Sequence, residues 1–224
     1  MSIVLVIAAH PDDDILGCGG TLKKESINGS NIYTIFVSDG ESSRLIKNNY
    51  QKLENRKKNA NQASKIVGSQ PPIFLDFNDQ KLDNYPFLEI TKKIEKYIFE
   101  LNPDTVFTHS NTDLNIDHKI VHLAAVTATR PQKKLNLKNL FFFEILSSTE
   151  WNFSDSKSIF KPTYFIDIAK TINFKIKAIK EYKKELKNWP HPRSIEGIET
   201  LAKYRGMQVG KKYCEAFYAG KIIN

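Results

Sequence analysis

The stretch that decides the fold is IVLVIAAHPDDDILGCGGTL, from Ile3 to Leu22. It begins as a short run of apolar, largely β-branched residues, which predicts a strand buried on both faces of a sheet. The run ends in a histidine, a proline and three aspartates, and a glycine-rich segment of helical character follows at once. Because ligands bind beyond the carboxyl ends of the strands in open parallel sheets, these polar residues are candidates for a ligand site.

The rest of the chain repeats this alternation of apolar strands with segments of helical period. Strands are predicted at 3–8, 31–38, 72–77, 105–109, 140–146 and 164–168, and helices at 16–26, 50–67, 85–100, 117–128, 169–186 and 194–208. The last residues, 194–224, are expected to lie over the core as helices. This order predicts an α/β fold, a Rossmann-like three-layer sandwich with a mostly parallel sheet and right-handed crossovers.

Length and composition indicate one globular domain, residues 1–224, with 41% hydrophobic residues. No apolar run approaches the roughly 20 residues of a membrane span, and no leader precedes the first strand. With only two cysteines, Cys18 and Cys214, we expect a reducing, cytoplasmic setting. The net charge of +8 comes from dispersed lysines, so a solvated surface or an anionic ligand both stay open and no nucleic-acid partner is expected. The oligomeric state is left open.

The segment HPDDD has two interpretations. One aspartate is enough to cap the following helix. Three aspartates after a histidine, at a strand end, instead favour a bound cation, and a divalent metal is the simplest one. Pro11 stiffens the turn, so that His10 and Asp13 can face the same point. The following GCGG is not a G-x-G-x-x-G motif and indicates tight packing rather than a dinucleotide site.

A second polar cluster, THSNTDLNIDHKIVH at 108–122, follows the fourth predicted strand. His118 completes a His–Asp–His set with His10 and Asp13. Three protein ligands with one open position are typical of catalytic zinc, although such ligands also admit other divalent metals. His122, four residues further on, offers a helical pair with His118, but we expect it to be a supporting or core histidine.

AHPDDDILGCGGTL together with DLNIDH resembles the PIG-L/LmbE-type family of zinc-dependent de-N-acetylases. VSDGE and ENRKKNANQASKIVG extend the resemblance over most of the chain. The resemblance implies that His10, Asp13 and His118 bind the metal and that Asp12 does not bind it and acts as the general base. It also implies an N-acetylated amino sugar as the substrate, carried on a lipid, a nucleotide or a small thiol.

The chain departs from the family pattern in two places. Many members read H-P-D-H where this sequence reads NIDH, so Asn115 stands in the place of a histidine that stabilises the oxyanion. Asn115 itself, His109 or His191 can take that role. Asn59 stands where a glutamate is expected, three residues after Arg56.

Other polar residues are candidates for supporting or binding roles. Asp117 either orients an imidazole or caps a helix. Asp113 is expected to bind sugar hydroxyls, or to be a turn residue. Trp151 either stacks on a sugar ring or packs in the core. Four arginines are candidate phosphate ligands or surface ion-pair residues, namely Arg44, Arg56, Arg193 and Arg205.

The function predicted from the sequence is a metal-dependent deacetylase of an N-acetylated sugar that bears phosphate, in surface polysaccharide or glycoconjugate assembly. One alternative is a metallophosphoesterase, which usually needs two metals and a bridging carboxylate. The other is a non-catalytic nucleotide-binding α/β domain, which leaves Asp12, Asp13 and His118 without a purpose.

Overall fold

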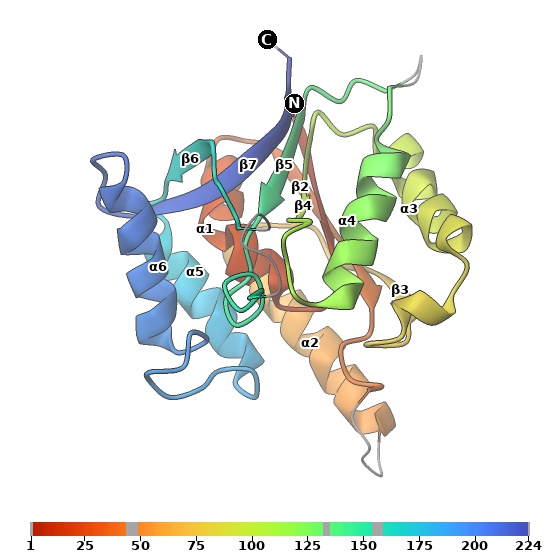
Figure 1. The fold of residues 1–224 in the computed structure, drawn as a ribbon, viewed down its shortest axis with the longest axis horizontal. Coiled ribbons are helices and arrows are strands. Elements are labelled where there is room, and N and C mark those ends of the chain that lie inside the picture. The colour runs from red at the N-terminus through yellow and green to blue at the C-terminus, as the bar shows by residue number, and fades with distance from the viewer. Residues whose placement is uncertain (1, 44–48, 132–134, 154–158, 224) are drawn as a thin grey trace.

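The structure, a computed structural model, describes residues 2–43, 49–131, 135–153 and 159–223. Its elements alternate between strand and helix through most of the chain (Figure 1). The strands are β1 (Ile3–Ala8), β2 (Asn31–Ser38), β3 (Ile73–Phe77), β4 (Thr105–His109), β5 (Asn139–Phe143), β6 (Tyr164–Asp167) and β7 (Cys214–Ile222). The α-helices are α1 (Asp13–Ile27), α2 (Asn49–Val67), α3 (Phe87–Leu101), α4 (Ile116–Ala128), α5 (Ile172–Ile179) and α6 (Ile195–Met207), and two 3₁₀ turns are η1 (Leu82–Asn84) and η2 (Lys180–Tyr182).

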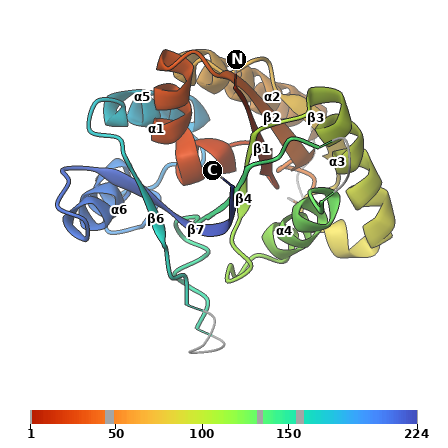
Figure 2. The ribbon, with the colours of Figure 1, turned by 90° about the horizontal axis from the view of Figure 1, so that it is seen from above.

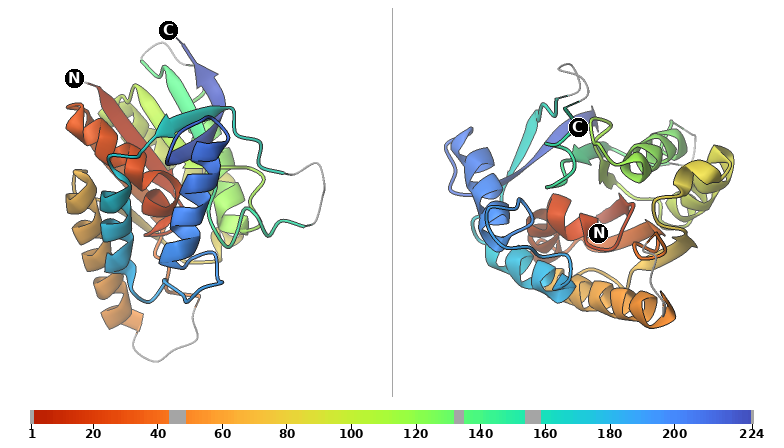
Figure 3. Two further views of the ribbon diagram at one scale, coloured as in Figure 1. Left: turned by 90° about the vertical axis from the view of Figure 1, so that its left-hand side faces the viewer. Right: turned by 60° about the horizontal axis from the view of Figure 1, so that its bottom comes forward.

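The described strands form a seven-stranded sheet in the order β3-β2-β1-β4-β5-β7-β6. Neighbours from β3 to β5 pair in parallel, and β7 runs antiparallel to both β5 and β6. Figure 2 shows α1, α2 and α5 on one face of this sheet and α3 and α4 on the other. Figure 3 shows α2 and α5 side by side on their face. The predicted three-layer α/β fold is therefore confirmed.

Both faces of the central strands are buried, as the continuous apolar runs predict. Along β1, Val4 and Val6 belong to the core cluster under α1, α2, α5 and α6. Leu5 and Ile7, which alternate with them, belong to the cluster under α3 and α4. A strand with two buried faces cannot shift its register by one residue without changing the packing of both layers, so the end of β1 is firmly placed.

The prediction for the end of the chain was wrong in part. α6 is present, but β7 follows it where only helices were expected. Alanine, lysine and glutamate in 214–222 favour a helix by intrinsic propensity, and pairing with β5 and β6 on both sides overrides that preference. The strand also depends on Gly220, where an added Cβ would lie 2.6 Å from the ring of Phe142.

Helix α1 starts at the aspartates, three residues earlier than predicted, and bends at Cys18. The glycines around the bend allow close packing, as predicted. A Cβ on Gly17 would lie 2.5 Å from the ring of Phe143, and one on Gly20 would lie 2.8 Å from Ile168. The helix predicted at 169–186 is shorter, because α5 tightens into η2 and the following turn places Glu185 beside α2.

The strand order reverses between β1 and β4, which pair directly with each other. The loops after these two strands therefore leave the sheet on opposite sides of one crevice, where ligands bind in doubly wound folds. Among the described helices, none has the length and apolarity to cross a membrane.

Candidate active site

The loop between β1 and α1 carries the HPDDD segment into the crevice. Asp12 has φ 124° and ψ −26°, an unusual backbone conformation for a residue with a Cβ. Its carboxylate makes no capping bond to α1 within the described residues, so the simple helix-cap interpretation does not account for Asp12. Residues held in such conformations cluster at functional sites.

Three ligand atoms meet at the bottom of the crevice. His10 Nδ1 lies 3.2 Å from Asp13 Oδ2 and 3.2 Å from His118 Nε2, and the last two atoms are 3.3 Å apart. All three side chains are buried. The other oxygen of Asp13, Oδ1, is buried without a hydrogen-bond partner in the described part of the chain.

Carboxylates face the outer nitrogen of each imidazole. His10 Nε2 lies 3.0 Å from Asp79 Oδ1 and 3.3 Å from Asp117 Oδ2. His118 Nδ1 lies 3.1 Å from Asp113 Oδ1. A carboxylate favours a proton on the nitrogen that faces it, so the inner nitrogens of the neutral rings present lone pairs toward Asp13.

These three atoms fit a divalent metal. Bonds of about 2.0–2.1 Å in a tetrahedral site put neighbouring ligand atoms about 3.3–3.4 Å apart, close to the observed separations. The charges agree with this, because burial lowers the pKa of His118 but Asp13 and Asp113 raise it to about 9. Burial raises the pKa of Asp13, yet His118 and His10 hold it well below its usual value. The site therefore attracts positive charge.

Two further groups of possible ligands share these histidines, namely His10–Asp79–Asp117 and His109–Asp113–His118. Their aspartates are engaged by other groups. Asp117 accepts the backbone N–H groups of Gln80 and Leu82 at 2.8 and 3.2 Å.

Asp113 is fully buried and accepts hydrogen bonds from the hydroxyls of Ser148 and Thr149 and from the N–H of Asn115. This position differs from the predicted contact with sugar hydroxyls, because the carboxylate has no exposed surface. Asp113 Oδ1 instead lies 3.1 Å from His118 Nδ1. Asp117 orients an imidazole, as one of its two interpretations has it, but the imidazole is that of His10.

Asp12 lies between two arginines. Arg56 Nη2 is 3.2 Å from its Oδ1, and Arg193 Nη1 is 3.2 Å from its Oδ2. Burial raises the pKa of Asp12, the two guanidinium groups lower it, and the balance is about 6. A base with a pKa near 6 is ionised at neutral pH and still accepts a proton readily.

Arg56 is itself held by acids from distant segments. Glu185, after η2, and Glu41, after β2, contact its Nη1 at 2.5 and 3.7 Å. Asn59, the second departure from the family pattern, lines a separate hollow beside Arg56 with Asn55 and Gln62. A glutamate was expected at position 59 of α2, and acidic partners for Arg56 come instead from Glu41 and Glu185 on other segments.

A cavity of about 200 Å³ opens above the three ligand atoms. Of the predicted residues, six contribute to its described lining: His10, Asp12, Arg56, Asn115, His118 and Arg193. The Oδ1 of Asn115 accepts the N–H of Asp117 at the start of α4. The described lining does not include Trp151 or His191.

The other candidate histidines have structural contacts of their own. His191 Nδ1 accepts the N–H of Arg193 at 3.0 Å, and its ring meets Trp151 edge-on at 5.6 Å. His109 is fully buried, stacks on His118 at 4.0 Å and accepts the N–H of Ala9. Burial and the neighbouring His118 lower the pKa of His109, so it is a neutral support behind the site.

His122 and Arg205 have contacts outside the described lining of the cavity. His122 Nδ1 donates to the carbonyl of His109 at 2.8 Å, and its ring packs on Phe142, in agreement with the predicted supporting role. Arg205 pairs with Glu144 at 2.6 Å. Arg44 lies outside the described residues.

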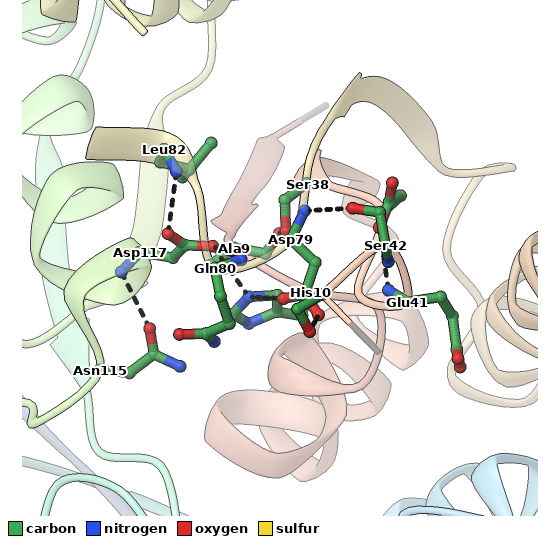
Figure 4. Close-up of polar contacts among 12 residues, drawn as sticks. Ala9, His10, Ser38, Glu41, Ser42, Asp79, Gln80, Leu82, Asn115 and Asp117 are labelled. Atoms are coloured by element: carbon green, nitrogen blue, oxygen red, sulfur yellow. Dashed lines mark hydrogen bonds and ion pairs between the residues drawn. The ribbon is translucent and has the colours of Figure 1, made fainter. Parts of the chain in front are cut away.

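Sequence reasoning missed Glu185, which follows η2, and also Asp79 and Gln80, which follow β3; all three line the cavity. Figure 4 shows Asp79 and Gln80 beside His10, with Gln80 also near Asn115 and Asp117. A signal for these two residues was present, because NDQK comes directly after the third predicted strand. Polar residues after a parallel strand point to the ligand edge there as they do after β1 and β4.

Comparison with known proteins identifies the family of the chain. The model of the PIG-L family, described as GlcNAc-PI de-N-acetylase, matches residues 5–129. The chain belongs to this family. The matched part includes β1, α2 and α4, and it ends before the segment that carries Arg193.

Relatives extend the likeness over the whole chain. Diacetylchitobiose deacetylase of Thermococcus kodakarensis is 23% identical over 221 residues, which cover 95% of this chain and 80% of that protein. The structure of N,N'-diacetylchitobiose deacetylase from Pyrococcus horikoshii has a TM-score of 0.79 at 22% identity, covering 98% of this chain and 84% of that one. GalB of Pseudomonas putida KT2440, a 4-carboxy-2-hydroxymuconate hydratase, has the same TM-score at 19% identity, covering 100% and 98%. The fold alone therefore does not specify the reaction.

Proposed function

We propose that the chain is a metal-dependent deacetylase that hydrolyses the acetamide of an N-acetylated amino sugar. The observation that carries the proposal is the convergence of His10 Nδ1, Asp13 Oδ2 and His118 Nε2 within 3.2–3.3 Å of one another, with Asp12 on the same cavity. Membership of the PIG-L family and the similarity to diacetylchitobiose deacetylase support the substrate class. We propose zinc as the ion, because two imidazoles and one carboxylate with an open position are its usual catalytic ligands.

When bound, the ion supplies a Lewis acid for the amide carbonyl and makes a water molecule more acidic. The work left to the protein is to move one proton. Asp12 is suited to it, because the two arginines fix both of its oxygens and keep it ionised at neutral pH.

In the proposed reaction Asp12 takes a proton from the attacking water as the water oxygen bonds to the carbonyl carbon. The same carboxyl group then gives this proton to the amide nitrogen as the C–N bond breaks. The products are acetate and the free amino sugar. The two adjacent aspartates have different roles in this proposal, since Asp13 binds the metal and Asp12 stays free to act as the base.

We further propose that the sugar carries a negatively charged group, as in a nucleotide- or lipid-linked sugar of surface polysaccharide or glycoconjugate assembly, and that residues 1–224 act as one domain. Arg193 supports the anionic substrate, since it lies at the cavity with part of its side chain exposed. The net charge of +8 acts in the same direction.

A metallophosphoesterase is less well supported. Two-metal sites need a second set of ligands about 3.5–4 Å from the first ion. The other possible groups among the described residues reuse His10 or His118, and their aspartates accept protein hydrogen bonds.

The test is a mass-spectrometric screen of the purified protein against N-acetylated free sugars, nucleotide sugars and lipid-linked sugars, each with zinc and with chelator. We expect one acetyl group to be lost from one class of substrate, only with metal. Metal-loaded protein that removes no acetyl group from any class contradicts the proposal.

A further inference from the structure

Gln80 has a backbone conformation that its side chain does not favour. Its φ is +52°, in the left-handed region, which glycine adopts freely and residues with a Cβ adopt at a cost. The chain nevertheless has glutamine there. Because strained backbone conformations cluster at functional sites, a glutamine at this position beside the cavity suggests that its side chain has a function.

The carboxylate of Asp117 holds this conformation. Its Oδ2 accepts the N–H of Gln80 at 2.8 Å and also lies 3.3 Å from His10 Nε2. The backbone of Gln80 and the ring of His10 are therefore fixed against the same carboxylate. Gln80 thereby lies on the same cavity as His10 and His118.

Asn115 lies on the same cavity and is oriented by a related contact. Its Oδ1 accepts the N–H of Asp117 at 2.9 Å, so its NH₂ is the end that can donate elsewhere. Gln80, Asn115, His10 and His118 all line the cavity. In Figure 4 the carboxamide of Gln80 is drawn between Asn115 and the ring of His10.

We propose that Gln80 is a catalytic residue that, together with Asn115, donates N–H groups to the oxyanion formed on the acetamide carbonyl. The inference rests on the deacetylase proposed above. His109 is fully buried behind His118, and His191 is bonded to the backbone of Arg193 outside the described cavity lining. The carboxamides of Gln80 and Asn115 thus take the role of the histidine that many family members have in place of Asn115.

The roles in this step are separate. As the water oxygen adds to the carbonyl carbon, the electron pair of the C=O bond moves to oxygen, and Gln80 and Asn115 only donate hydrogen bonds to it. The proton of the water goes to Asp12 and then to the nitrogen as the C–N bond breaks. Donors aimed at developing charge act mainly on kcat, and the loss of one costs about 10²–10³-fold in a well-enclosed site.

The decisive variant is Gln80→Gly, because glycine suits the backbone and removes only the side chain. We expect its melting temperature to equal or exceed that of the wild type, while kcat falls at least about tenfold with KM changed less than about threefold. Gln80→Glu, which has similar size but donates no N–H when ionised, should lose at least as much.

Asp76→Gly is the matched control. Asp76 has φ +55° near the end of β3, the strand that precedes Gln80, and its side chain is 59% exposed and paired with Lys57. The control gains the same backbone freedom, so its kcat should stay within about twofold of the wild type. A tetrahedral phosphonamide analogue of the substrate should bind Gln80→Gly about tenfold more weakly, with binding of the product amino sugar unchanged.

Wild-type kcat in Gln80→Gly, or a change in KM alone, overturns the role of Gln80 and leaves the deacetylase proposal intact. A wild-type protein that deacetylates nothing in the substrate screen removes both. The two failures are therefore distinguishable.

Discussion

Replacing Asp12 by asparagine should make the metal-free protein more stable and the metal-loaded protein nearly inactive. Asparagine has almost the same shape, but its single side-chain oxygen can accept from only one of the two arginines, Arg56 or Arg193. It also carries no charge and accepts no proton. The two effects have one cause, because the buried charge that the reaction needs is costly in the folded state.

The magnitude follows from the pKa of Asp12, which is about 6 in the folded protein against an ordinary 3.8. A folded pKa above the unfolded value means that the native state binds the proton more tightly, so stability falls as pH rises from about 4 to 6. At pH 7 the ionised carboxylate lowers the free energy of unfolding by about 3 kcal/mol. Asp12→Asn should recover part of this free energy above pH 6, less than the full amount because one guanidinium group loses its acceptor, and the gain should vanish below pH 4.

The assay is urea unfolding in chelator at pH 4 and pH 7, with Asp76→Asn as the control. The Asp76 side chain is 59% exposed, so its replacement should change stability by less than about 1 kcal/mol at both pH values. In the metal-loaded protein, Asp12→Asn should retain the metal and lose about 10²–10⁴-fold in kcat. An Asp12→Asn protein that is less stable at pH 7 than the wild type, or that keeps wild-type kcat, refutes the reasoning.

Four other results are expected. His118→Ala should lose the metal as measured by elemental analysis, whereas His122→Ala should retain it, and the reverse outcome would make His122 the ligand. Asp113→Asn should weaken metal binding about 10- to 100-fold by isothermal titration, because His118 loses the carboxylate that orients it; unchanged affinity contradicts that role. Arg193→Gln should raise KM for phosphate-bearing sugars more than for neutral ones, and an equal rise for both argues against the anionic substrate. The rate should fall on the acid side of the pH profile as Asp12 becomes protonated, at a pH below about 6, because a bound cation lowers the pKa of Asp12 from its metal-free value of about 6; a flat acid limb of the profile argues for another base.

Most of the fold follows from local patterns in the sequence. The boundaries of β1, β2 and β4 agree with prediction because each strand is a short apolar run that ends in polar residues. β7 was missed because its position depends on pairing with β5 and β6, which lie far away along the chain. The intrinsic helix propensity of a segment cannot predict a strand that forms because two neighbouring strands pair with it.

The residues of the site also fall into those that a local motif predicts and those that depend on contacts between remote segments. His10, Asp12 and Asp13 lie in one motif, so a single segment of sequence predicts their chemistry. The polar segment after β3 is a local signal for Asp79. Its contact with His10 and the contact of Glu185 with Arg56 join segments that are remote in sequence, so no local pattern predicts these partners. Asp113 illustrates a different limit, because its type and place in a loop suit a sugar contact, and only its burial reveals that it supports His118.

The most direct test of the central claim is to titrate chelated protein with zinc while following acetate release from the substrate found in the screen. The account predicts that activity rises in proportion to added zinc and reaches its limit near one ion per chain in the wild type, and that His118→Ala stays inactive over the same range. Full activity in the chelated protein, or the same zinc response in His118→Ala, would contradict it.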